Sequence, residues 1–411
     1  MSTMSTKWYI GRDLIFKGIT LLLMIVAILP SYRSGYALPT LAVMEMIYAF
    51  IFFPRFYKTF RQVLFPILGY AVMCYLVALP FDFKMGFVHP FMSLWIWIFP
   101  IIMASELIKY KSFDTNRFIY FGSLGILMII IVATLKAIAE NPIVMRDITA
   151  GLDENFVAKM NSMNIGGFAI AYGCGVILLS LTGCLFTYKI RGFNKYLVIG
   201  LIVLLGVLVI MAQFTTLLII CGIIFCYQCL QFKGSAGLKF ILISGIIIIV
   251  FFSKEILAYI IVFFQGSVTA HHLQEIYDSV FEDASYDNTR SIYMSNSIDL
   301  FLSSPILGNN VSSGINATTV YESHSTIMTV LCKTGIIGLT AYLSAFWKAF
   351  KPVLKSWDHH TKKILGGSLS GYYLLLAFLN PAENDIFSYC LGLVAILTVY
   401  YLSNLKNKEY V

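Results

Sequence analysis

The sequence predicts an all-α membrane protein in which about twelve helices cross the bilayer and one long outer-face loop holds short helices. The 411-residue chain is 59% apolar and 12% charged, whereas soluble domains average about 45–50% and about 25%. Mean hydropathy is +0.81. The composition therefore excludes pure nucleic-acid binders, secreted disulfide scaffolds and disordered tails.

Apolar runs of the length that crosses a bilayer, about 17–25 residues, follow one another along the chain. No small-residue cleavage site follows the first run, so we interpret it as a retained span rather than a signal peptide. A short polar break at Gln213 and Phe214 divides two of the spans. The predicted spans cover residues 14–30, 37–53, 63–80, 91–107, 118–139, 164–188, 196–212, 215–230, 238–252, 325–347, 364–379 and 386–402.

Most of the 29 Lys and Arg residues fall in alternate connections between these spans. With the N-terminus in the cytoplasm, every inner connection carries at least two cations, as the positive-inside rule requires. The C-terminus is then cytoplasmic too. The net charge of +8 is accordingly a topology signal rather than a footprint of nucleic acid.

The predicted spans divide the chain into three regions. Residues 1–252 hold the first nine transmembrane helices and a polar outer loop near 140–163. Residues 253–324 form a long outer loop, and residues 325–411 hold the last three helices and a cytoplasmic tail. Connections this long usually carry a function. We therefore expect the chemistry of the protein in the 253–324 loop.

The middle of this loop has the pattern of a helix. Asp287-Asn288-Thr289 offers N-capping side chains, and apolar residues follow at helical spacing until Pro305 and Gly308 end the pattern. Arg290 falls in the first turn, where the helix macrodipole disfavours a cation. Either an anionic ligand or an ion pair with Asp283 or Asp287 would account for it.

The end of the loop places a histidine just before a span. His324 precedes Ser325, and it shares one predicted helical face with Gly335 and Gly338. Two glycines on that face would let another helix approach closely below the histidine. Taken alone, His324 is most simply an interfacial polar residue.

The order of these features resembles the C-terminal region of the O-antigen polymerase and O-antigen ligase superfamily. The features are Arg290, a helix, Pro305-Ile306-Leu307-Gly308, then His324-Ser325 and a span with Gly335-x-x-Gly338. The resemblance is sharpest over residues 290–345 and extends over the rest as topology only. It implies a glycosyltransferase of the GT-C-like architecture. The pair His324-Ser325 is more similar to O-antigen and capsular polysaccharide polymerases than to ligases, which tend to carry His-Asn.

The resemblance implies glycosyl transfer from undecaprenyl diphosphate on the outer face of the bacterial inner membrane, with no metal or other cofactor. His324 would be the general base, and an unperturbed pKa of about 6.5 suits that role. Arg290 would bind the diphosphate, with Arg146 as a second candidate contact. Expected partners are the lipid-linked oligosaccharide donor and acceptor, membrane lipid, a chain-length regulator and a flippase.

The chain departs from the superfamily at one point. Many members carry an Arg where one span enters the next, and the corresponding residues here, 211–218, contain none. This departure weighs more against the ligase than against the polymerase. The ligase therefore stays an alternative, and a lipid-linked oligosaccharide flippase is a less favoured one, because polarity is concentrated in one outer loop.

Two charged residues lie deep within predicted spans. Glu45 and Lys333 are candidate contacts in the bundle or to the substrate, because intramembrane charges are functional by default. The alternative for Glu45 is a protonated side chain hydrogen-bonded inside the bundle, near Lys333. The pairs His271-His272 and His359-His360 have no metal-ligand spacing, and the eight cysteines are expected to be small buried residues.

Overall fold

The computed structural model describes residues 2–32, 37–52, 56–77, 83–110, 113–151, 153–232, 244, 253–263, 265–266, 268–281, 289–309, 325–380, 382 and 385–408. All regular secondary structure in these ranges is helical, and none of their residues lies in a β-strand. The predicted all-α fold of a polytopic membrane protein is confirmed.

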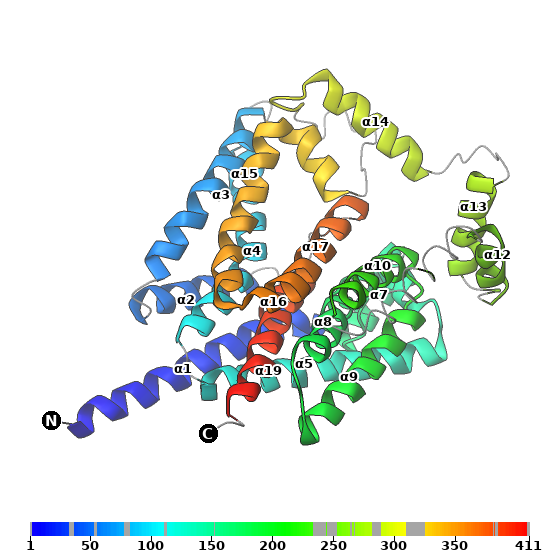
Figure 1. Ribbon diagram of the computed structural model, residues 1–411. Helices are drawn as coiled ribbons and strands as arrows, with labels where there is room; N and C mark the ends of the chain where they lie inside the picture. Colours follow the sequence, from blue (N-terminus) through cyan, green and yellow to red (C-terminus); the bar gives the residue numbers. More distant parts are fainter. Residues whose placement is uncertain are drawn as a thin grey trace.

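The helices of the first half are joined mostly by short connections (Figure 1). They are α1 (Ser2–Ile28), η1 (Pro30–Tyr32), α2 (Ala37–Phe52), α3 (Phe56–Val77), η2 (Lys84–Val88), α4 (His89–Tyr110), α5 (Phe113–Glu140), α6 (Val144–Ala150), α7 (Glu154–Ser162), α8 (Phe168–Thr187), α9 (Gly192–Met211) and α10 (Thr215–Gln231).

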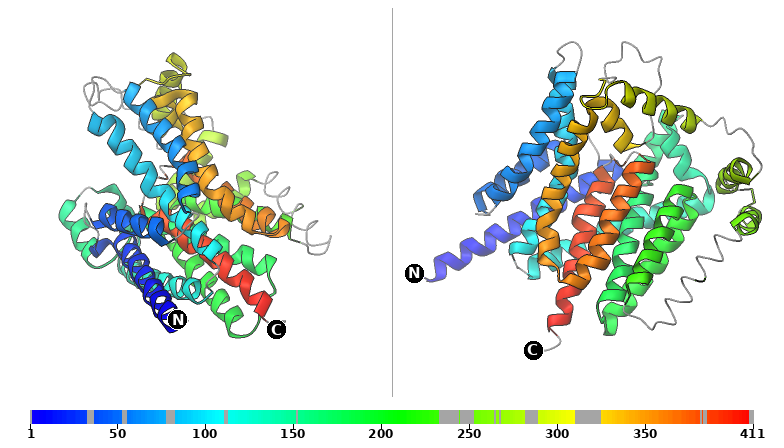
Figure 2. Two further views of the ribbon diagram at one scale, coloured as in Figure 1. Left: turned by 90° about the vertical axis from the view of Figure 1, so that its left-hand side faces the viewer. Right: turned by 45° about the horizontal axis from the view of Figure 1, so that its top comes forward.

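The second half begins with helices of the long loop. These are α12 (Ser253–Phe263), α13 (Val268–Phe281) and α14 (Thr289–Ser303). The remaining helices are α15 (Thr326–Ser356), α16 (His359–Thr361), η3 (Lys362–Gly366), α17 (Gly367–Leu379), α18 (Asp385–Tyr389), η4 (Cys390–Ala395) and α19 (Ile396–Lys408). In Figures 1 and 2, α14 lies across one end of the bundle, and α12 and α13 pack on each other to one side.

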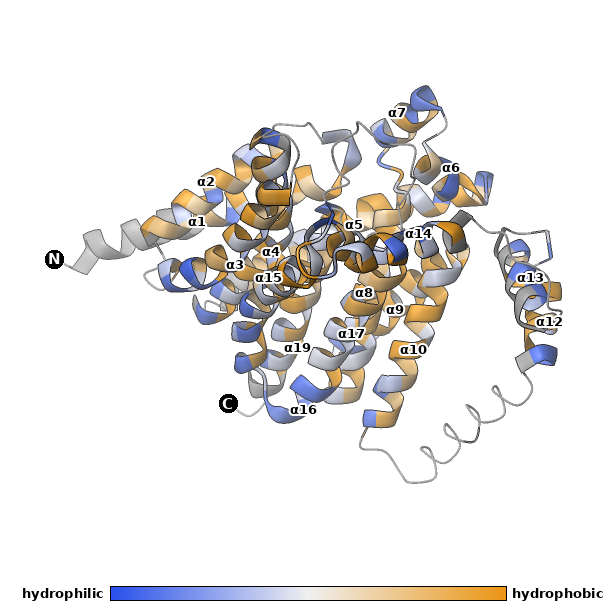
Figure 3. Ribbon diagram, turned by 90° about the horizontal axis from the view of Figure 1, so that it is seen from above, coloured by the Kyte–Doolittle hydropathy of each residue, from blue (hydrophilic) through white to orange (hydrophobic). Residues whose placement is uncertain are grey.

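Seven helices of the described ranges are long and apolar enough to cross a bilayer. Every predicted span except 238–252, which lies almost wholly outside the described residues, overlaps a helix. The count of twelve stays a prediction. Apolar residues run along α8, α9 and α10, whereas α16 is hydrophilic and α7 carries residues of both kinds (Figure 3). The seven are Phe56–Val77, Gly86–Lys109, Arg117–Glu140, Phe168–Thr187, Asn194–Met211, Thr326–Ser356 and Asp385–Leu405.

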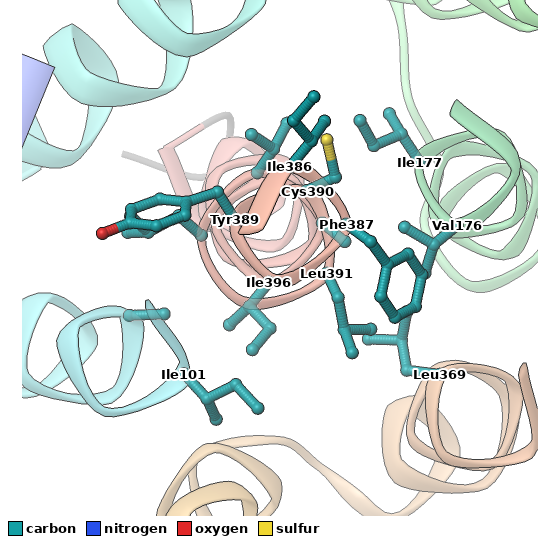
Figure 4. Close-up of a cluster of buried hydrophobic side chains, with 14 of the residues drawn as sticks. Ile101, Val176, Ile177, Leu369, Ile386, Phe387, Tyr389, Cys390, Leu391 and Ile396 are labelled. Atoms are coloured by element: carbon teal, nitrogen blue, oxygen red, sulfur yellow. The ribbon is translucent and has the colours of Figure 1, made fainter. Parts of the chain in front are cut away.

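The last span forms the centre of the bundle. Its residues 386–399 are all buried, and it packs against α4 and α8. Glycines permit this close approach, because a Cβ on Gly173 would lie 2.8 Å from the sulfur of Cys390, and one on Gly392 would lie 2.7 Å from Pro100. Figure 4 shows apolar side chains from three other helices around it: Ile101, Val176, Ile177 and Leu369.

A buried amide joins three spans. Gln228 of α10 is 0% exposed, accepts a hydrogen bond from Thr182 of α8 at 2.8 Å and donates to the Leu179 carbonyl at 2.7 Å and to Ser368 of α17 at 3.0 Å. Interhelical hydrogen bonds of this kind stabilise bundles in lipid, where no water can satisfy a polar group.

An ion pair within α4 is hydrogen-bonded to α3. The carboxylate of Glu106, which is 3% exposed, accepts hydrogen bonds from Lys109 Nζ at 2.6 Å and from the Thr59 hydroxyl at 2.9 Å. Lys109 Nζ also donates to the Thr59 hydroxyl at 3.0 Å. The negative charge of Glu106 is thus compensated inside the bundle by a cation and a hydroxyl.

We expect Lys109→Met to destabilise the protein, because it leaves the buried Glu106 carboxylate without its cation. Breaking a buried pair costs about 3–5 kcal/mol, and the value here falls at the low end because Lys109 is 33% exposed. Thermal unfolding in detergent measures the effect. The double variant with Glu106→Gln should recover most of it, and Lys195→Met, at an exposed site of α9, should change little. An unchanged midpoint for Lys109→Met contradicts the assignment.

Candidate functional site

The segment 305–308 and the part of α15 around Gly335, both of which carry the resemblance to the superfamily, are hydrogen-bonded to each other. The backbone N–H of Ile336 donates to the Pro305 carbonyl at 2.9 Å, and that of Ile337 donates to the Ile306 carbonyl at 3.4 Å. The segment 305–308 therefore supplies hydrogen-bond acceptors to α15 where that helix is bent (Figure 1).

Gly335 produces the bend. Its φ of 61° and ψ of −165° lie in a region that is essentially restricted to glycine. A Cβ at Gly335 would collide with the Ile306 carbonyl, and a Cβ at Gly308 would collide with the backbone of Lys333. The prediction that these glycines admit another helix is wrong, because a turn approaches Gly335, and a Cβ at Gly338 would meet Thr334 of its own helix.

The helix predicted in the long loop is present as α14 and is fastened to the first part of α15. The Cys332 thiol donates to the Ser297 carbonyl at 3.1 Å, and the Asn309 amide donates to the Leu300 carbonyl at 2.7 Å. Arg290 is the second residue of α14, and its side chain lies outside the described residues. The backbone of Arg290 therefore belongs to an element that is fixed to α15.

His324 lies outside the described residues, but Ser325, which follows it, is buried and hydrogen-bonded to two helices. Ser325 is 1% exposed and is the N-cap of α15, where its hydroxyl accepts from the Met328 N–H at 3.3 Å. The same hydroxyl donates to the Ala377 carbonyl, in the last turn of α17, at 3.2 Å. The start of α15 is thus joined to the end of α17.

Arg146 of α6 lies at the break between α9 and α10. Its Nε and Nη2 donate to the Gln213 carbonyl at 3.3 and 3.1 Å, and its guanidinium lies 5.8 Å from the centroid of the Phe214 ring. Gln213 has a left-handed φ of 56°, which turns the chain between the two helices. A cation from the 140–163 loop therefore occupies the region where the sequence itself, over 211–218, carries no Arg.

A chain of contacts links Arg146 to Ser325. The rings of Phe214 and Tyr172 lie 6.1 Å apart, and the Tyr172 hydroxyl accepts from the Asn380 amide at 3.0 Å. Asn380 follows the same last turn of α17 that binds Ser325. The structure thus brings Arg146 and the residue after His324 to one end of the bundle. Sequence pattern alone does not identify Tyr172 and Asn380, although Asn380-Pro381, directly after an apolar run, marks a helix end.

The chemistry that this end of the bundle favours is anion binding. The N-terminus of α10 begins at Thr215, next to Phe214, and carries the positive end of a helix dipole. The half-buried guanidinium of Arg146 adds a full charge at the same place. A phosphate group is the anion that such an arrangement suits best.

The remaining candidates lie elsewhere. Glu45 is 0% exposed and accepts a hydrogen bond from Thr20 at 2.5 Å, and no ion pair joins it to the half-buried Lys333. The expected neighbourhood of Glu45 and Lys333 is not found. His271 lies 3.4 Å from Glu275 on α13, at the surface.

The cysteines match the prediction of small, buried residues. All of them are free thiols, and all except the half-buried Cys226 are buried. Among the residues that the structure describes, no three His, Cys, Asp or Glu side chains are grouped so as to hold a metal ion.

We expect Gly335→Ala to prevent normal folding of the α14–α15 joint, because a Cβ cannot occupy this backbone conformation beside the Ile306 carbonyl. The cost should be at least about 1–3 kcal/mol, measured by thermal unfolding in detergent. The matched control is Gly222→Ala in α10, where a Cβ meets no atom within 4 Å. Equal unfolding midpoints for the two variants would refute the role of the Gly335 bend.

Comparison of the chain with known protein families and with curated protein sequences finds no match. The resemblance to the O-antigen polymerase and ligase superfamily accordingly rests on the order of residues in this sequence. To that order the structure adds the contact between the 305–308 segment and Gly335, and the anchoring of Ser325.

Proposed function

We propose that this protein is a polysaccharide polymerase that joins oligosaccharide repeat units linked to undecaprenyl diphosphate. The reaction takes place on the outer face of the bacterial cytoplasmic membrane, where the long loop and the 140–163 loop meet the bundle. Both termini lie in the cytoplasm. The enzyme is a glycosyltransferase that needs no metal.

The observation that carries this proposal is the position of Arg146 relative to Ser325. Two segments far apart in the sequence meet at one end of the bundle, through Phe214, Tyr172 and Asn380. One contributes a cation suited to a diphosphate, and the other is the residue next to the candidate base. A glycosyl transfer needs both functions within the span of one substrate.

In the proposed reaction His324 takes the proton from a hydroxyl group of the acceptor sugar. The resulting nucleophilic oxygen forms a bond to the anomeric carbon of the donor sugar. The bond between that carbon and the diphosphate oxygen breaks, and undecaprenyl diphosphate leaves with the electron pair. Arg290 and Arg146 stabilise the negative charge that develops on this leaving group.

The position of Arg146 also bears on the departure from the superfamily at residues 211–218. A cation reaches the break between α9 and α10 from another loop, so the absence of an Arg within 211–218 does not leave the site without positive charge. This supports two cations, Arg290 and Arg146, as contacts for the diphosphate of the leaving lipid.

We expect His324→Ala to reach the membrane at normal level and to lose most transfer, since a positioned base contributes about 10²–10⁴-fold. The glycan ladder of the cells is the measurement, and His359→Ala in α16 is the control. Single repeat units on the final acceptor, with long chains absent, are the expected product. Long glycan that accumulates on undecaprenyl diphosphate would show a ligase, and a normal ladder would remove His324 from the reaction.

We expect Arg146→Lys to fail almost as badly as Arg146→Gln, because a lysine lacks the planar fork of donors. The KM for the lipid-linked donor should rise in both variants, while unfolding in detergent separates this effect from damage to the α9–α10 break. Lys159→Gln, an exposed cation of α7 in the same loop, is the matched control. Full activity of Arg146→Lys would show that the diphosphate is held elsewhere.

A further inference from the structure

The bundle contains two buried carboxyl groups with different surroundings. Glu106 of α4 has Lys109 at 2.6 Å, whereas Glu45 of α2 has a hydroxyl group as its hydrogen-bond partner. Glu45 is 0% exposed, as is Thr20 of α1, whose hydroxyl donates to Glu45 Oε1 at 2.5 Å. The second oxygen, Oε2, is buried and accepts no hydrogen bond from any residue that the structure describes.

A second unsatisfied polar atom lies near this carboxyl group. Tyr389 of α18 is 0% exposed, and α18 packs on α1, the helix that carries Thr20. This hydroxyl also has no hydrogen-bond partner in the described part of the chain. Figure 4 shows the Tyr389 ring leaving its helix on the side opposite Val176 and Phe387. These two buried polar groups therefore come from α2 and α18, two of the helices that pack on α1, which carries Thr20.

The charge of an ionised Glu45 would be uncompensated. No ion pair joins Glu45 to a described Lys or Arg side chain. The cations on neighbouring helices have other contacts or face outward. Lys17 of α1 lies over the Phe118 ring, Lys109 of α4 pairs with Glu106, and Lys58 and Arg61 of α3 are exposed. On α18, Asp385 and Tyr389 are themselves acidic groups. An ionised carboxylate in such surroundings is strongly disfavoured.

We propose that Glu45, Thr20 and Tyr389 form a buried proton-binding site in which Glu45 is a neutral carboxylic acid. Glu45 Oε1 accepts from Thr20, and Oε2 carries the proton. The acid proton and the Tyr389 hydroxyl are then a donor and an acceptor, and a buried water between them would satisfy both atoms. The ligand is a proton rather than a metal ion, because one carboxyl and two hydroxyl groups are too few oxygens for a cation cage.

The site fastens the first two helices to the centre of the bundle. Both α2 and α18 pack on α1, and Glu45, Thr20 and Tyr389 come from one of these helices each. Loss of the proton would place a charge at this joint and separate the helices. The site is independent of the proposed glycosyl transfer, since none of its residues belongs to the α14–α15 joint or to the α9–α10 break.

Infrared spectroscopy of the purified full-length protein at neutral pH tests the proposal. A neutral carboxylic acid has a C=O stretching band that is separate from carboxylate bands and shifts in D₂O. We expect this band in the wild type, its loss in Glu45→Gln and its displacement in Tyr389→Phe. Glu106→Gln is the matched control and should keep the band, because Glu106, unlike Glu45, is paired with Lys109.

Unfolding in detergent gives a second readout. Glu45→Gln should unfold at nearly the wild-type temperature, since a neutral amide keeps the acceptor for Thr20, whereas Glu45→Ala should unfold earlier. The proposal is overturned if the wild type lacks the acid band, or if the band is unchanged in both Glu45→Gln and Tyr389→Phe. It is also overturned if added sodium or potassium raises the unfolding midpoint of the wild type but not that of Glu45→Gln, because that result identifies a metal-cation site.

Discussion

The architecture of the candidate site depends on which groups accept hydrogen bonds from the backbone of α15 where Gly335 breaks the helix. Gly335 interrupts the helix, and the N–H groups of Ile336 and Ile337 lose their usual acceptors within it. Lipid offers no replacement, so another segment must supply carbonyl groups. The 305–308 segment does so, and it can approach only because Gly335 and Gly308 have no Cβ. One hydrogen-bonding requirement therefore fixes the bend of α15 and the 305–308 segment that follows α14 together.

The other half of the site follows from a similar requirement. The chain between α9 and α10 reverses through a left-handed Gln213, which leaves its carbonyl outside regular helix pairing. Arg146 satisfies that carbonyl and stacks on Phe214. The guanidinium is thereby positioned by structural contacts before any ligand arrives. A cation held in this way loses little side-chain freedom on binding, which favours a tight contact with phosphate.

Much of the fold could be predicted from the sequence because lipid imposes a simple rule on composition and length. Apolar runs predicted the positions of α3, α5 and α9, and the helix pattern after Thr289 predicted the position of α14. The sequence could not reveal that Pro305–Gly308 and Gly335 touch, since the contact depends on a backbone bend. It also could not place Arg146 against Gln213, because hydrophobic periodicity carries no information about which loops meet. The sequence also did not reveal the hydrogen-bond partner of Glu45, since Thr20 is an ordinary residue within an apolar helix.

The depth of each candidate within its helix separates the proposed substrate contacts from residues enclosed in the bundle. A lipid-linked oligosaccharide has a tail that stays in the bilayer and sugars that stay in water, so its diphosphate lies at the boundary. Ser325 and Thr215 begin helices, and Arg146 lies beside the second of them. Glu45 lies near the middle of α2 and is fully enclosed, and Lys333 lies about 10–12 Å along α15 from its start. In the proposed function, a diphosphate at the boundary meets Arg146 without leaving its natural depth, whereas Glu45 is enclosed within the bundle.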